Sequence, residues 1–155
     1  MKWIDLPPVW LLGFLVVTWW IGQVQPAGLS IAGGVAQFTA GLLIGTGVVL
    51  MALAVLALRQ HRTTVIPHLE ADNLVTTGVF RISRNPIYLG DALLLAGFAL
   101  RWDAAGALFL VPIFMWIIQR RFILPEERRL RAKFDAAFGR FCASTGRWIS
   151  LRYLR

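Results

Sequence analysis

The sequence predicts an all-α integral membrane protein with about four transmembrane helices and an amphipathic C-terminal helix. Hydrophobic residues make up 57% of the 155 residues and charged residues only 15%. A soluble domain of this size does not have enough interior to bury so much apolar surface. The charged residues also gather at the ends of long apolar blocks, as they do at the two faces of a bilayer. We therefore expect a single membrane-embedded domain over residues 1–155.

The first two apolar blocks are each long enough to cross a bilayer. The first, residues 8–24, follows Pro7, which suits the first turn of a helix because its missing N–H would have no partner there. Tryptophans near both ends of this block are typical of the headgroup layer. The second, residues 35–58, contains Gly41 and Gly45 at a spacing that lets another helix approach closely. Glycines are also simply frequent in membrane helices, which is the alternative explanation.

The third and fourth spans are expected at residues 86–100 and 104–122, although the third block is short for a full crossing. Asp91 lies inside the third block, where an acid is either a functional residue or an interfacial partner of a nearby arginine. Pro125 is expected to interrupt the helix after the fourth span. Within residues 126–145, Leu130, Phe134, Phe138 and Phe141 recur at three- and four-residue spacing with basic residues between them. This pattern predicts an amphipathic helix that lies on the membrane or folds back over the loop.

The Lys and Arg residues fall almost entirely on one side of this predicted topology. With four spans, Arg101 is the one residue of the 16 that lies on the other side. The positive-inside rule makes the richer side cytoplasmic, so we expect cytoplasmic N- and C-termini and a cytoplasmic loop at residues 63–85. The net charge of +8 then favours anionic membrane lipids over nucleic acid as partners.

The most polar stretch between the apolar blocks is LVTTGVFRISRNPIYLG, residues 74–90. Several residues near this stretch can bind a ligand: Arg81, Arg84, Asn85 and Tyr88 in the stretch itself, and Glu126 and Glu127 on the same predicted face. Arginines bind carboxylates, glutamates bind an ammonium or ribose hydroxyls, and aromatic rings hold a purine or a cation. The residues alone therefore indicate a polar ligand site at a membrane face, without a metal cluster.

Two motifs occur in a fixed order along the chain. The first covers residues 74–81 and 84–90, and the second begins at Glu126-Glu127, continues through Leu130 and Phe134, and ends at Arg147-Trp148, which we interpret as an interface anchor. In order and spacing they resemble the isoprenylcysteine carboxyl methyltransferase family and its phospholipid N-methyltransferase relatives. The resemblance covers about residues 63–149, and we expect a bacterial member located in the inner membrane.

The resemblance implies S-adenosyl-L-methionine as the methyl donor, bound in a pocket that the C-terminal helix covers. Carried over by position, the cofactor-binding residues are Asp72, Asn73, Leu74, Val75, Phe80, Asn85, Pro86, Tyr88, Glu126 and Glu127, with the choice between the two glutamates open. The family's substrate-contacting arginine precedes the glutamates, where Arg121 is the candidate and Arg120 is its neighbour. The candidate catalytic residues are Arg84, Asn85, Asp91 and Arg121.

The chain departs from the family pattern at a few positions. Asn85 stands where the family often has histidine, and an asparagine can donate hydrogen bonds but cannot act as a general base. Asp135 stands where a glycine usually follows the phenylalanine, and Phe138 and Phe141 replace the usual tyrosines. These departures bear on the substrate more than on the cofactor.

Methyl transfer to a lipid or isoprenoid-like acceptor from the bilayer is therefore the expected activity. Carboxylate O-methylation is favoured, because an ionised carboxylate needs alignment and desolvation more than a base. The alternative is phosphatidylethanolamine N-methylation, for which Asp91 or a glutamate would be the base. A further alternative is an NADPH-dependent membrane reductase of sterol-reductase-like fold, which should require more basic residues than Arg81 and Arg84 in the loop. A helical membrane protein without enzymatic activity would leave the polar detail of the loop unexplained.

Overall fold

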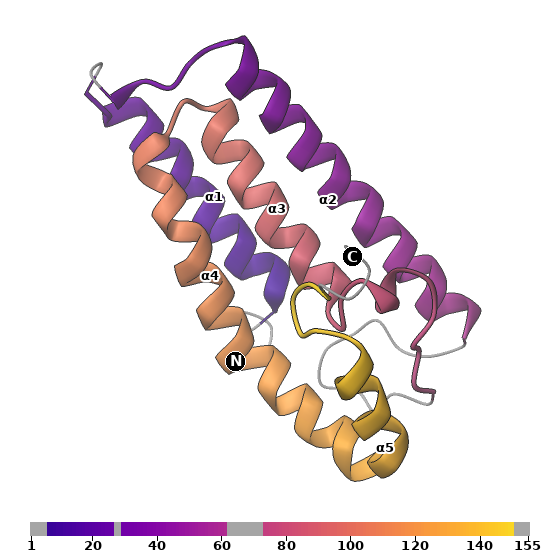
Figure 1. Cartoon of the computed structure of the whole chain (residues 1–155). Coiled ribbons are helices and arrows are strands. Elements are labelled where there is room, and N and C mark those ends of the chain that lie inside the picture. Colours follow the sequence, from indigo (N-terminus) through magenta and orange to yellow (C-terminus); the bar gives the residue numbers. More distant parts are fainter. Residues whose placement is uncertain (1–5, 27–28, 62–72, 151–155) are drawn as a thin grey trace. The chain divides into compact units, whose positions relative to one another are not determined.

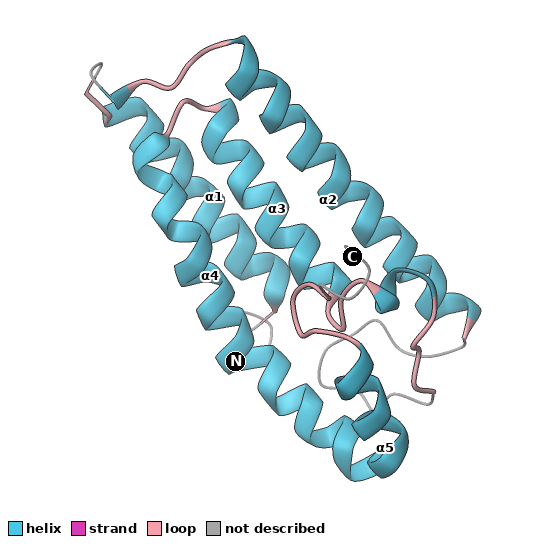
Figure 2. Ribbon diagram, viewed as in Figure 1, coloured by secondary structure: helices cyan, strands magenta, loops and turns pink. Residues whose placement is uncertain are grey.

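The computed structural model describes residues 6–26, 29–61 and 73–150, and these residues form helices and loops without a strand (Figure 2). The first helix, α1, spans Pro7–Val24, α2 spans Gly34–Gln60, and α3 spans Pro86–Arg101. These bounds agree with the first three predicted blocks to within two residues. The predicted all-α fold class is confirmed.

The fourth predicted span begins as the 3-10 turn η3 (Ala105–Phe109) and continues as α4 (Leu110–Ile118). It passes through a π-helical turn, η4 (Gln119–Ile123), into α5 (Leu124–Ser144). The predicted break is therefore a π turn and not a loop, and the new helix expected after it begins at Leu124. Pro125 lies in the first turn of α5, where its missing N–H is tolerated, and the wider π turn absorbs the change in backbone without a loop.

Among the described residues, three helical stretches are long and apolar enough to cross a membrane, namely α1, α2 and the run Ala105–Ser144. The shorter α3 has 16 residues, fewer than the about 20 that a full crossing usually takes. Large apolar side chains stay exposed along α2, among them Val35, Phe38 and Leu42. Exposure on this scale indicates a surface that lipid covers. The chain is a helical membrane protein.

The chain divides into two compact units, Met1–Val48 with Gly90–Ile118, and Val49–Leu89 with Gln119–Arg155. In the first unit, α1 packs against α4 and η3 (Figure 1). The core of this unit is made of small and medium apolar side chains: Ala99, Ala104, Ala107 and Leu110, with Phe14 and Ile21 packed against them. The rings of Phe14 and Phe114 meet edge to face at 5.3 Å, which is a favoured geometry for aromatic pairs.

Asp103, in the connection between α3 and α4, forms hydrogen bonds with the connection between α1 and α2. Its carboxylate accepts hydrogen bonds from Ser30 Oγ at 2.6 Å and from the Ile31 N–H at 2.7 Å. Its backbone carbonyl accepts one from Gln25 Nε2 at 2.8 Å. The α1–α2 and α3–α4 connections therefore lie at the same end of this unit, as neighbouring antiparallel helices require.

Helices of the first unit approach their neighbours at glycines other than the predicted pair. A Cβ atom added to Gly41 or Gly45 would meet no atom of the described chain within 4 Å, so neither glycine makes a close helix contact here. On Gly22 the same Cβ would lie 2.7 Å from the carbonyl oxygen of Trp102. Gly97 likewise admits the backbone of α2, with the nearest backbone atoms at 3.1 Å. Within the described chain, Gly41 and Gly45 thus agree better with the alternative explanation, that glycines are frequent in membrane helices.

The second unit is built around a hydrophobic cluster that joins the polar loop to α5. Its buried members are Ala54, Val75, Phe80, Phe138 and Phe141. Leu130 and Phe134 of α5 pack against them. All four apolar residues of the predicted amphipathic pattern therefore belong to one cluster, and α5 is folded over the loop.

The second half of α5 changes direction because Asp135 interrupts the helix. Its φ of 36° and ψ of −109° lie in a region that residues other than glycine rarely adopt. Figure 1 shows α5 folding back on itself near the end of the described chain. One continuous helix over residues 126–145, as predicted, would point Phe138 and Phe141 along the original axis instead of back into the cluster. The departure from the family's glycine thus coincides with a strained turn.

Replacing Asp135 by glycine should stabilise the protein by about 1 kcal/mol. Glycine adopts positive φ without a steric penalty, whereas a side chain in this region costs about 1–3 kcal/mol, which the greater chain entropy of glycine offsets in part. The measurement is thermal unfolding of the detergent-purified protein. The control Ala136→Gly lies in ordinary helix and should destabilise by about 0.5–1 kcal/mol. A lower melting temperature for Asp135→Gly than for the wild type would show that the turn is not strained.

Candidate functional site

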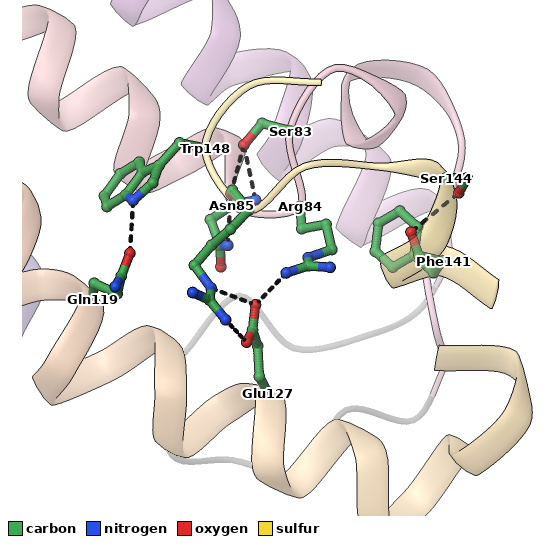
Figure 3. A network of polar contacts seen from close by, with 9 residues as sticks. Ser83, Arg84, Asn85, Gln119, Glu127, Phe141, Ser144 and Trp148 are labelled. Atoms are coloured by element: carbon green, nitrogen blue, oxygen red, sulfur yellow. Dashed lines mark hydrogen bonds and ion pairs between the residues drawn. The ribbon is translucent and has the colours of Figure 1, made fainter. Parts of the chain in front are cut away.

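The loop and the C-terminal segment meet in a partly buried ion-pair network centred on Glu127 (Figure 3). Arg84 Nη2 donates to Glu127 Oε1 at 2.8 Å. Arg147 donates to the same carboxylate twice, from Nε at 3.0 Å and from Nη2 at 2.7 Å. The side chains of Arg84 and Glu127 are only 10% and 13% exposed. One carboxylate thus joins two arginines that lie far from each other in the sequence.

The charges of this network determine the ionisation of Glu127. Burial favours its neutral form, but the hydrogen bonds from Arg147 and the positive charges of Arg84 and Arg147 outweigh burial and hold its pKa below the usual range. Glu127 is therefore ionised at neutral pH. A buried pair of this kind is strongly destabilised when one partner is removed, because the remaining charge has lost its compensation.

Neutral hydrogen bonds hold the same two segments together beside the ion pairs. Asn85 Nδ2 donates to the carbonyl oxygen of Arg147 at 3.0 Å, and the Arg84 N–H donates to that of Gly146 at 3.0 Å. Ser83 Oγ accepts from the Asn85 N–H at 3.0 Å and donates to the Arg147 carbonyl oxygen at 3.3 Å. The side chain of Asn85 therefore serves as a neutral donor that fixes the backbone, a task that needs no general base.

Gly146 and Trp148 show how the turn after α5 is built. A Cβ atom on Gly146 would collide with the carbonyl oxygen of Ile149, so only glycine fits there. Trp148 is half-buried, and its Nε1–H donates to Gln119 Oε1 at 2.9 Å. Both side chains thus bind within the second unit, and the interpretation of Arg147-Trp148 as an interface anchor stays a prediction. The position of Arg147 and Trp148 at the end of the second motif was the feature of the sequence that pointed to these contacts.

Most of the predicted loop residues lie in the interior of the second unit. Val75 and Phe80 belong to the hydrophobic cluster, and Pro86 is fully buried. Tyr88 is 7% exposed, and its ring centroid lies 6.4 Å from that of Phe122. Contacts of these residues with a cofactor stay predictions.

The remaining predicted residues are more scattered. Asn73 is exposed, and its Nδ2 donates to the carbonyl oxygen of His61 at 2.8 Å. Asp72 lies outside the described residues. Asp91 is buried in the first unit, and Arg121 is exposed on the π turn of the second. The structure brings Arg84, Asn85 and Glu127 together, and the catalytic roles of Asp91 and Arg121 stay predictions.

The two adjacent glutamates have different surroundings. Among the described residues Glu126 has no hydrogen bond or ion pair, in contrast to Glu127. Burial raises the pKa of Glu126, although Arg129 lowers it and Glu127 adds to the rise. Glu126 is therefore the carboxylate that stays available to a ligand.

Two hollows open on the second unit, with no lining residue in common. The larger, of about 510 Å³, is lined by Leu74, Thr76, Arg81, Ala137, Arg140, Phe141, Ser144 and Thr145. The smaller, of about 400 Å³, is lined by Arg120, Leu124, Glu127, Arg128, Arg131 and Arg147. The predicted residues Leu74 and Glu127 therefore line different hollows, not one.

The helical membrane fold and the two joined motifs define a class of membrane enzyme. The family model of the phospholipid methyltransferases matches residues 35–137, about two thirds of the chain. The chain belongs to the phospholipid methyltransferase family, a family of membrane methyltransferases, as the two sequence motifs indicated. Neither the curated proteins nor the solved structures provide a match.

Replacing Glu127 by glutamine should lower the free energy of unfolding by about 3 kcal/mol at neutral pH, because Arg84 and Arg147 would face a neutral amide. The lowered pKa of Glu127 sets the pH dependence. The stabilisation is complete above the unfolded value of about 4.5 and is lost as pH falls through the lower folded value. The wild type and the variant should therefore converge in stability as pH falls below 4.5 and through the lowered folded pKa of Glu127.

The matched control is Glu126→Gln, which removes the neighbouring carboxylate. Because the pKa of Glu126 is raised, its ionisation opposes folding as pH rises, so this variant should be as stable as the wild type at neutral pH or more stable. The stabilities of Glu127→Gln, Glu126→Gln and the wild type are measured by thermal unfolding in detergent at a series of pH values. Equal losses for the two variants would contradict the network as described.

Proposed function

We propose that this protein is an S-adenosyl-L-methionine-dependent membrane methyltransferase that acts on a lipophilic acceptor. The observation that supports this most is the network around Glu127, because it joins the loop motif at Arg84 to the end of the second motif at Arg147. A cofactor pocket formed by both motifs requires them to be held together in this way. The family assignment favours methyl transfer over the NADPH-dependent reduction that the sequence left open.

The residues of the second unit fit the methionine end of this cofactor. A zwitterionic amino-acid group needs a donor for its carboxylate and an acceptor for its ammonium. Arg84 Nε is buried without a hydrogen-bond partner in the described part of the chain, and such a donor is costly unless a ligand accepts from it. Glu126 offers an acceptor that no arginine occupies.

The two glutamates would therefore have separate roles. Glu126 would contact the ammonium or a ribose hydroxyl of the cofactor, whereas Glu127 would position Arg84 through their ion pair. Asn73, Leu74, Asn85, Pro86 and Tyr88 would complete the pocket. Val75 and Phe80 would act through the hydrophobic cluster, which fixes the loop and excludes water from it.

S-adenosylmethionine supplies an electrophilic methyl group on a sulfonium, so the protein's own contribution is positioning and desolvation. For a carboxylate acceptor, the arginine Arg121 on the π turn would orient the acceptor, and no base would be needed. We propose this reaction first. The membrane face would be the cytoplasmic one, since the basic residues gather there in a four-span topology.

Phospholipid N-methylation is the second candidate, and a specific observation favours it. An amine must lose a proton before it attacks, and the best base has a pKa near the working pH. The raised pKa of Glu126 brings it closer to that range, and Asp91 is the other proposed base. The family's description as phospholipid methyltransferases points the same way.

Calorimetry of the detergent-purified protein with S-adenosylhomocysteine tests the cofactor. We expect binding of S-adenosylhomocysteine and none of NADPH. Glu126→Gln should weaken the binding about tenfold, since it removes one charge-assisted contact. The matched control Lys133→Gln removes an exposed charge from the same helix, one that does not act on Glu126, and should leave affinity unchanged. Folded wild-type protein that fails to bind S-adenosylhomocysteine would refute the proposal.

Membrane lipids incubated with a methyl-labelled donor and the protein would identify the acceptor. We expect label that mild alkali releases, since carboxylate esters hydrolyse readily and methylamines do not. Label that resists alkali and stays with phosphatidylethanolamine would instead establish N-methylation. In that case the rate should rise with pH and fall strongly in Glu126→Gln or Asp91→Asn, because one of these acids would serve as the base.

A further inference from the structure

The smaller hollow of the second unit has an unusual concentration of positive charge. Four of its six lining residues are arginines, and its one acid is Glu127. Glu127 is already shared by Arg84 and Arg147, so it cannot neutralise the others. Among the described residues, the positive charge of the hollow is therefore left without compensation.

Three of these arginines have N–H donors that no described residue accepts from. Among the described residues, Arg120, Arg128 and Arg131 make no hydrogen bond or ion pair. The guanidinium of Arg131 lies 5.9 Å from the ring centroid of Phe138, a contact that orients the group without using its N–H donors. Like charges at three- and four-residue spacing on a helix repel each other. A bound anion would remove this repulsion.

The cofactor is a poor occupant of this hollow. S-adenosylmethionine has one carboxylate, one ammonium and one sulfonium, so its net charge is positive and the arginines would repel it. A zwitterionic lipid headgroup fits little better, because its ammonium would need a free acid and Glu127 is paired. The occupant must have a net negative charge.

Phosphate on a lipid satisfies these conditions best. Arginine forks bind phosphate oxygens two at a time, whereas a single carboxylate is satisfied by one fork. Leu124 adds an apolar side chain to the rim. The first lining residue along the chain is Arg120, two residues after the apolar helix Leu110–Ile118 ends. Basic residues at the end of an apolar helix are typical of the boundary between a membrane span and the headgroup layer.

We propose that the hollow lined by Arg120, Arg128, Arg131 and Arg147 is a binding site for the phosphate headgroup of an anionic phospholipid, separate from the cofactor site. The lipid is bound as a ligand and is not itself methylated. Its phosphate oxygens accept from the three unpaired arginines, and its acyl chains extend into the bilayer. The site discriminates by net charge, so it selects anionic lipids over zwitterionic ones.

The test titrates purified protein in a neutral detergent with four probes: dioctanoyl phosphatidylglycerol, dioctanoyl phosphatidylcholine, inorganic phosphate and octanoate. We expect phosphatidylglycerol to bind about tenfold or more tightly than each of the others, with an affinity that falls as salt is added. The double variant Arg128→Gln/Arg131→Gln should lose about tenfold or more in affinity for phosphatidylglycerol. Both arginines are exposed, so the variant should unfold at the wild-type temperature.

The matched control is Arg129→Gln/Lys133→Gln, which removes the same charge from the same helix but leaves the lining of the hollow intact. It should keep its affinity for phosphatidylglycerol to within about twofold, because only long-range charge is lost. An equal loss in the control would show diffuse surface attraction and overturn the proposal. Equal affinity for phosphatidylcholine, phosphate or octanoate would overturn it too, as would no binding of phosphatidylglycerol.

Binding of S-adenosylhomocysteine to the same variants separates this site from the cofactor site. The lipid-site variant should bind S-adenosylhomocysteine as the wild type does. If it loses both ligands while its melting temperature is unchanged, the hollow is part of the cofactor site and the proposal fails. If the wild type binds phosphatidylglycerol but not S-adenosylhomocysteine, the lipid site stands and the proposed enzymatic function fails.

Discussion

The second unit depends on one shared carboxylate. Glu127 is largely removed from water, and a charge in that position must be compensated nearby. Arg84 from the loop and Arg147 from the turn after α5 provide the compensation. Because both arginines bind the same group, neither segment can move away without leaving a buried charge unpaired. The loop geometry around Ser83 and Asn85 is held in place by this constraint.

The adjacent residues Glu126 and Glu127 of α5 consequently differ in their ionisation and in the groups that they can bind. Glu127 is ionised and fully engaged, whereas Glu126 is partly buried and has no partner among the described residues. An ionised, paired carboxylate such as Glu127 suits a structural role, whereas an unpaired, partly buried one such as Glu126 suits the binding of a ligand or the transfer of a proton. The positive charge left over by the same arrangement collects in the smaller hollow. The same carboxylate thus pairs with Arg84 of the loop and lines the smaller hollow.

Strain near this site has an identifiable origin. Asp135 adopts a backbone conformation that favours glycine, and it does so where the chain must reverse to bring Phe138 and Phe141 onto the loop. Burial of two phenylalanines stabilises the fold by several kcal/mol, which exceeds the about 1–3 kcal/mol of strain. The hydrophobic cluster therefore determines the path of the chain, and the backbone of Asp135 accommodates it.

The sequence by itself determined the helices, the membrane class and the family, because hydropathy and helical periodicity are local properties. It also identified Leu130, Phe134, Phe138 and Phe141 as one apolar set. Only the tertiary structure decided that the break at Pro125 is a π turn, that Asp135 bends α5, that Asn85 binds a carbonyl, and that Arg147 and Arg84 share Glu127. These features depend on which side chains meet across many residues of sequence. A buried charged side chain needs an oppositely charged partner nearby, and the identity of that partner cannot be predicted from the local sequence pattern.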